Sequence, residues 1–85
     1  MEIDREVLAT LDDVLSLKGR ASGFKRSTPL MNSLPELDSM AVAAILTSLE
    51  ERFGFTIEDD EVDAATFATV GSLVAFVESK LETTR

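Results

Sequence analysis

The chain has 85 residues, 45% hydrophobic and 28% charged, and eight basic against sixteen acidic side chains give a net charge of −8. This length suits one small domain without a deep catalytic cleft, and the charge disfavours nucleic acid but favours basic protein surfaces. The sequence contains no cysteine or histidine, which excludes disulfides, a thiol nucleophile, and the commonest general base and metal ligand.

A first amphipathic helix is predicted over residues 3–17, because apolar residues recur there at helical spacing among acidic ones. Those apolar positions are Ile3, Val7, Leu8, Leu11, Val14 and Leu15. Gly19 is its expected stop. The acidic amino terminus does not resemble a signal peptide, and no apolar run has the length of a membrane span. We therefore expect a cytoplasmic protein.

Residues 19–37 form a long first loop, since glycine, proline, serine and asparagine recur throughout and argue against a continuous helix. Four apolar side chains are expected to hold this loop against the core: Phe24, Leu30, Met31 and Leu34. Half of the basic residues lie in or beside it and are interpreted as solvated loop charges: Lys18, Arg20, Lys25 and Arg26.

A second helix is predicted over residues 39–53, where apolar residues fall on one helical stripe. The stripe consists of Val42, Ile45, Leu46, Leu49 and Phe53. Asp38 or Ser39 can cap its amino terminus by accepting a backbone N–H, and Gly54 is suited to end it.

An acidic run from Glu58 to Asp63 follows, and a short third helix is predicted over residues 60–66, with Val62 and Phe67 facing inward. The run does not fit a calcium-binding loop, because Ala64 and Val70 stand where that loop needs a glycine and a glutamate. We therefore predict no metal site.

A fourth helix is predicted over residues 70–81, with Thr69 as its cap. Its buried stripe is expected to be Val70, Leu73, Val74, Val77 and Leu81. The predicted fold is one all-α domain over residues 1–85: a four-helix antiparallel bundle with three longer helices, one short third helix and a long first loop.

The tripeptide Asp38-Ser39-Met40 by itself fits a simple helix cap. A serine in the first helical turn after a long loop is also exposed, rigidly held and accessible to another protein's active site. Because no histidine exists and no base is evident beside it, the Ser39 hydroxyl cannot activate itself. Ser39 is thus a candidate substrate for modification by an external enzyme, and the protein itself is not expected to be an enzyme.

Four features, in order, resemble acyl carrier proteins over about residues 3–82: Asp38-Ser39-Met40, the apolar pattern of the next helix, Glu50-Glu51-Arg52-Phe53-Gly54, and Thr69-Val70-Gly71-Ser72-Leu73. The resemblance implies a four-helix carrier fold in which Ser39 bears 4′-phosphopantetheine. Asp38 matches the motif aspartate, and Met40 stands where leucine is commoner.

The same resemblance implies the partners. A phosphopantetheinyl transferase would take the cofactor from coenzyme A with Mg²⁺ on the transferase. A ligase or acyltransferase would then load an acyl group as a thioester, for delivery to a downstream acyl-using enzyme.

The second helix departs from the fatty-acid-synthesis carriers, because alanines replace several acidic residues. The resemblance implies partner docking, more by apolar contact than by charge, at Met40, Ala43, Ala44, Thr47, Glu50 and Glu51. It implies an acyl-chain lining of Ile45, Leu46, Leu49, Phe53 and Val74. The segment 28–37 is similar to specialised stand-alone carriers, including those encoded with exosortase or exopolysaccharide systems.

Two alternatives remain open from the sequence. The cargo could be aminoacyl, peptidyl or D-alanyl, since carriers of these groups share the pattern. In a different class, the chain could be an unmodified acidic helical adaptor in which Ser39 only caps a helix. In each case we expect a monomer without a membrane span or a nucleic-acid partner.

Overall fold

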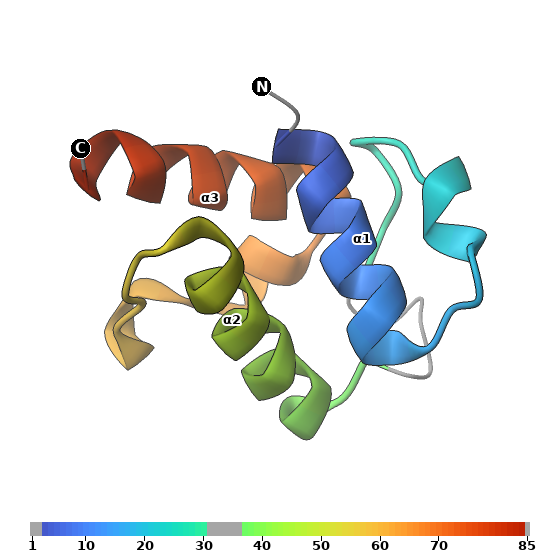
Figure 1. Ribbon diagram of the computed structural model, residues 1–85, viewed down its shortest axis with the longest axis horizontal. Helices are drawn as coiled ribbons and strands as arrows, with labels where there is room; N and C mark the ends of the chain where they lie inside the picture. The colour runs from blue at the N-terminus through green and yellow to red at the C-terminus, as the bar shows by residue number, and fades with distance from the viewer. Residues whose placement is uncertain (1–2, 31–36, 85) are drawn as a thin grey trace.

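The computed structural model of this chain describes residues 3–30 and 37–84. Its α-helices are α1 (Ile3–Leu15), α2 (Ser39–Phe53) and α3 (Val70–Thr84), and its 3₁₀ helices are η1 (Arg20–Gly23), η2 (Asp59–Glu61) and η3 (Ala64–Phe67). In Figure 1, α1 and α2 run in opposite directions, and α3 lies across the end at which α1 begins and α2 ends. The predicted all-α bundle with its long first loop is confirmed.

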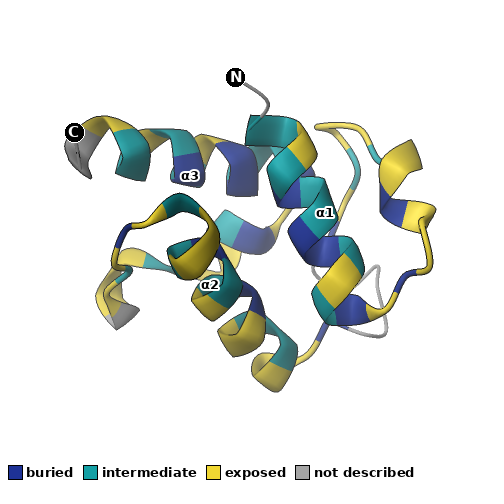
Figure 2. Cartoon of the chain, viewed as in Figure 1, coloured by how far each residue is buried: buried dark blue, intermediate teal, exposed yellow. Residues whose placement is uncertain are grey.

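The core is built from the predicted apolar stripes of the three α-helices. Figure 2 shows that the buried side of each helix faces the others. The apolar residues of the three α-helices that are at most 5% exposed are Val7, Leu11, Leu15, Ile45, Leu49, Val70, Leu73, Val74 and Val77. Other stripe residues pack against this core while half-buried: Ile3, Leu8, Val14, Val42, Leu46, Phe53 and Leu81. Removal of this apolar surface from water is the main favourable term in folding.

The first helix ends at Leu15, earlier than the predicted boundary at residue 17. Ser16 adopts a left-handed conformation (φ 54°), and the Leu17 N–H donates to the Asp12 carbonyl at 3.0 Å. This six-to-one hydrogen bond, whose donor Leu17 is fully buried, is the Schellman arrangement that ends helices. Ser16 occupies the left-handed position after the helix that glycine usually fills. The prediction that Gly19 ends the first helix is therefore wrong.

The predicted single short helix over residues 60–66 is replaced by two 3₁₀ turns, η2 and η3. Val62 is extended between them (φ −117°, ψ 134°). The Asp63 carboxylate then accepts the Thr66 N–H at 3.2 Å and caps η3. Because Asp63 is itself an amino-terminal cap with extended backbone, a helix cannot run through it.

Two of the four predicted loop anchors hold the first loop against the core. Leu30 is fully buried and Phe24 is half-buried. The Leu30 N–H donates to the Ala68 carbonyl at 2.9 Å, beside an isolated antiparallel bridge between Pro29 and Thr69. The other two predicted anchors, at positions 31 and 34, lie outside the described residues.

The start of α3 receives its hydrogen-bond acceptors from this loop. The Val70 and Gly71 N–H groups donate to the Thr28 and Arg26 carbonyls at 3.0 and 2.7 Å. The predicted Thr69 cap is present, because its hydroxyl accepts the N–H three residues later at 3.1 Å. The amino-terminal N–H groups of a helix need such partners, and here they fix the loop that leads towards α2. Among the described helices, none combines the length and apolar character needed to cross a membrane.

Candidate functional site

The start of α2 is fixed by its own sequence. The Asp38 carboxylate accepts the Ala41 N–H at 2.8 Å, and the Asp38 carbonyl accepts the Val42 N–H at 2.9 Å. At the other end, Gly54 takes the left-handed conformation (φ 74°) and donates its N–H to the Glu50 carbonyl. The two ends match the predicted boundaries, and of the two proposed caps Asp38 is the one that acts.

Ser39 is the first residue of α2 and is exposed to solvent. Within residues 3–30 and 37–84, no hydrogen bond occupies its hydroxyl, and none occupies the N–H groups of Ser39 and Met40. Free N–H groups at the positive end of a helix dipole suit a phosphate. The hydroxyl therefore holds no structural partner among the described residues, and its position fits attachment of a phosphate ester.

The nearest carboxylate cannot readily serve as a base for this hydroxyl. Asp38 already accepts a backbone N–H as the helix cap, and the chain has no histidine. A serine hydroxyl is a poor nucleophile without an adjacent base. Any reaction at Ser39 accordingly needs a base supplied by another protein.

The predicted docking residues share the outer surface of α2 with Ser39. Four of them form what we term the outer α2 face, and all four are exposed: Met40, Ala43, Ala44 and Thr47. Met40 is 83% exposed, which is unusual for a large apolar side chain. Glu51 continues this surface, whereas Glu50 is half-buried and its carboxylate accepts the Ile57 N–H at 2.7 Å.

A groove of about 440 Å³ lies beside Ser39. This Ser39 groove is lined by Leu37, Asp38, Ser39, Val42, Val62, Asp63 and Ala64. Its floor is mainly aliphatic, and its two carboxylates are already engaged with backbone N–H groups of their own helices. The groove can therefore hold an apolar or amide-containing chain that starts at the serine.

The predicted acyl-chain lining residues are not among those that line the groove. Ile45, Leu49 and Val74 are fully buried, whereas Leu46 and Phe53 are half-buried against the core. Phe53 stacks on Phe55 with ring centroids 5.8 Å apart. The sequence reasoning missed Leu37 and Ala64 as groove residues. Val62 was predicted to face inward, but no local signal placed it next to Ser39.

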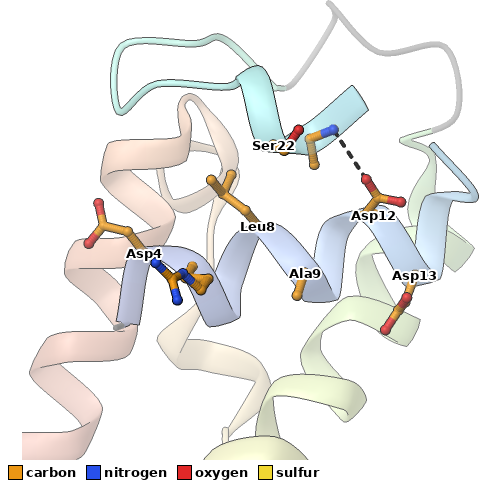
Figure 3. Close-up of a pocket in the computed structure, with 8 residues that line it drawn as sticks. Asp4, Leu8, Ala9, Asp12, Asp13 and Ser22 are labelled. Atoms are coloured by element: carbon orange, nitrogen blue, oxygen red, sulfur yellow. Dashed lines mark hydrogen bonds between the residues drawn. The ribbon is translucent and has the colours of Figure 1, made fainter. Parts of the chain in front are cut away.

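A second hollow, of about 560 Å³, lies between α1 and η1. Figure 3 shows Leu8 and Asp12 of α1 pointing toward the turn that carries Ser22, with this hollow between them. Each aspartate that lines the hollow is already bound: Asp4 to Arg26, Asp12 to two backbone N–H groups, and Asp13 to Arg52. These carboxylates stabilise the fold and offer no free acid or base.

Among the described residues, the carboxylates of Asp4 and Glu61 have perturbed pKa values, and each is in an ion pair. The hydrogen bond from Arg26 lowers the pKa of Asp4, and the hydrogen bond from Lys80 lowers the pKa of Glu61. A lowered carboxylate pKa keeps the charged form and suits a structural ion pair better than a general acid. The part of the chain that the structure describes holds no cluster of three or more potential metal ligands.

Comparisons with known proteins agree with this geometry. The family described as phosphopantetheine attachment site matches residues 5–77. A solution NMR structure of a holo acyl carrier protein from Nitrosomonas europaea is 48% identical, with a TM-score of 0.89 over 96% of this chain and 99% of that one. An acyl carrier protein from Exiguobacterium sp. (strain ATCC BAA-1283 / AT1b) is 48% identical over 44 residues, 52% of this chain and 53% of that relative, so this match spans about half of the relative's length.

The match over most of the domain, together with the shared fold, shows that the chain belongs to the acyl carrier protein family. Members of this family are carriers that work with transferases and acyl-using enzymes, and they are not catalysts. Their prosthetic group is covalently bound 4′-phosphopantetheine. The exposed hydroxyl at the start of α2, beside N–H groups that have no partner within residues 3–30 and 37–84, fits that group.

Proposed function

We propose that Ser39 is the attachment residue for 4′-phosphopantetheine and that the chain carries an acyl group on the thiol of that arm. The observation that carries the proposal is that two different residues at the start of α2 serve as the helix cap and as the candidate attachment site. Asp38 caps the helix, whereas Ser39 is exposed with an unengaged hydroxyl among the described residues. A serine needed only for structure would be expected to supply the cap.

Attachment would proceed on a phosphopantetheinyl transferase. The Ser39 Oγ bonds to the phosphorus next to pantetheine, the pyrophosphate bond of coenzyme A breaks, and adenosine 3′,5′-bisphosphate leaves. The hydroxyl proton passes to a base of the transferase, because this chain offers none at Ser39. The resulting phosphodiester would be favoured at the amino terminus of α2.

The cargo is best assigned to aliphatic acyl groups, ahead of aminoacyl, peptidyl or D-alanyl groups. The Ser39 groove is lined by the side chains of Leu37, Val42 and Val62, which suit an apolar chain. Asp38 and Asp63 are the carboxylates at its rim, and each is occupied by a backbone N–H. Each carboxylate keeps a second acceptor oxygen, so the assignment to aliphatic groups rests on the apolar lining of the groove.

The predicted lining residues would come into contact with a longer acyl chain only after α2 separates from its neighbours. Ile45, Leu49 and Val74 are completely buried, so a chain that reaches them must replace core contacts with its own. We assign the first part of the chain to the Ser39 groove. Deeper lining by these residues and by Leu46 and Phe53 belongs to a second, opened state.

Partner docking is assigned to the outer α2 face and to Glu51. The face carries no charge, so we expect a partner surface with an apolar recess for Met40 next to the bound serine. Buried apolar anchors of this kind dominate the energy of many interfaces. Glu50 is assigned a smaller part, because its carboxylate already holds the Ile57 N–H.

Intact-protein mass spectrometry after incubation with a promiscuous phosphopantetheinyl transferase and coenzyme A tests the attachment. The wild type should gain the mass of one phosphopantetheine group, and Ser39→Ala should gain none. Ser48→Ala, a second serine of the same helix, is the matched control and should be modified like the wild type. An unmodified wild type, or an adduct that persists in Ser39→Ala, would reject the proposal.

A further inference from the structure

One wall of the Ser39 groove belongs to the segment between α2 and α3. Val62, Asp63 and Ala64 form this wall, opposite Ser39 and Val42 of α2. We refer to these three residues as the groove wall. The segment is anchored at its two ends by Phe55 and Phe67, which are 5% and 1% exposed. What holds the stretch between these anchors sets the width of the groove.

An ion pair with α3 holds that middle stretch. The Lys80 Nζ donates to the Glu61 Oε1 at 2.8 Å and to the Oε2 at 3.0 Å. Glu61 Oε1 also accepts the Glu58 N–H at 2.8 Å, so one carboxylate ties both η2 and α3. On the other side of the pair, the Ile57 N–H is bound to the Glu50 carboxylate of α2.

The pair is better shielded from water than the other ion pairs of the described chain. The Lys80 and Glu61 side chains are 15% and 34% exposed, compared with 55% and 46% for Arg26 and Asp4. Removal from water strengthens the attraction between charges at a given distance. Consistent with this geometry, the hydrogen bond from Lys80 lowers the pKa of Glu61.

The groove wall starts at the residue after Glu61. Val62 is extended and half-buried and follows Glu61 directly in the chain, so a displacement of Glu61 moves the Val62 side chain with it. We propose that the Lys80–Glu61 ion pair is a positioning element that holds the groove wall on α3 and so restrains entry of the carried chain. The inference rests on the proposed function, since the groove matters only if an arm is attached at Ser39.

Glu61→Gln and Lys80→Met test the proposal from both partners. The amide oxygen that Glu61→Gln introduces can still accept the Glu58 N–H, so this substitution removes the charge and not the turn. Asp4→Asn is the matched control, because it removes a two-contact ion pair with Arg26 at a distant site. The double variant should add nothing to either single variant, as expected for residues that act as one unit.

The first measurement uses the apo protein and NMR amide exchange. The Ile57 and Thr66 amides lie on either side of the pair and are both hydrogen-bonded. We expect exchange about two- to fivefold faster in both pair variants, the factor that corresponds to a partly exposed ion pair. Asp4→Asn should leave these amides unchanged. Wild-type exchange in both pair variants, or an equal change in Asp4→Asn, would overturn the proposal.

The second measurement uses octanoyl-loaded protein and cleavage of the thioester by hydroxylamine. A wall released from α3 lets the chain enter further, so cleavage should be about two- to fivefold slower in both pair variants. An equal or faster rate would overturn the role in cargo entry. A wild type that accepts no phosphopantetheine would refute the proposed function instead, and amide exchange alone would still decide whether the ion pair positions the wall.

Discussion

Alanine substitution at Asp38 and Ser39 should separate structure from chemistry at the start of α2. Asp38→Ala removes the 2.8 Å hydrogen bond to the Ala41 N–H and a negative charge at the helix amino terminus. Loss of such a cap costs about 1 kcal/mol and loss of the dipole interaction about 0.3–1 kcal/mol. We expect a loss of about 1–2 kcal/mol in unfolding free energy and a fall in Tm of about 5–10 °C.

Ser39→Ala should change the unfolding free energy by less than about 0.5 kcal/mol, because the exposed hydroxyl holds no described partner. It should nevertheless abolish modification, whereas Asp38→Asn should keep most of the cap. Urea unfolding followed by circular dichroism gives the stabilities, and intact mass gives the modification. If Ser39→Ala destabilised the apo protein as much as Asp38→Ala, Ser39 would be a structural cap and the reasoning would fail.

Three further outcomes are expected. Gly71→Ala should cost about 1–3 kcal/mol in urea unfolding, because the new Cβ would lie 2.9 Å from the Arg26 carbonyl oxygen. Gly23→Ala, with open space around it, is the control and should be neutral. Met40→Ala should lower the kcat/KM of a transferase or ligase about tenfold with little change in stability. An unchanged kcat/KM with every partner would show that the outer α2 face is not a docking surface. The wild-type free energy of unfolding should fall as the pH drops through the lowered pKa of Asp4, because the carboxylate binds a proton more readily in the unfolded chain. Asp4→Asn should lose less stability over the same pH range. Equal acid sensitivity of the two proteins would contradict the ion-pair assignment.

Glu51 and the outer α2 face indicate how a partner would approach Ser39. The exposed positions nearest to Ser39 on α2 are occupied by Met40, Ala43 and Ala44, and the first exposed acid on this surface is Glu51. Electrostatic attraction mainly sets association rates and orientation, whereas buried apolar anchors contribute more to affinity. We therefore expect partner enzymes to be selected by how well their surface fits the apolar residues near Ser39. The negative charge of Glu51 would act mainly on their orientation during association.

Tertiary contacts decided the features that sequence reasoning missed. Leu15 is the last residue of α1 because Ser16 could adopt the left-handed conformation once Leu17 was buried. The predicted third helix became two turns because Asp63 caps a new one, and its extended neighbour Val62 packs against the core. Serine has no strong local preference for the left-handed conformation, so periodicity alone could not reveal the end of α1. The break at Asp63 has a local signal, because aspartate is a preferred cap and valine favours extended backbone, but helical periodicity does not register it.

The sequence by itself determined α2 and the exposed serine at its start. Asp38 and Gly54 act through hydrogen bonds and backbone angles of their own neighbourhood, and helical spacing alone selected the buried stripe. The Ser39 groove and the Lys80–Glu61 pair arise only in the folded chain, because they join residues that are far apart in sequence. Local patterns specify helices and their ends, whereas the width of a groove depends on how packed elements meet.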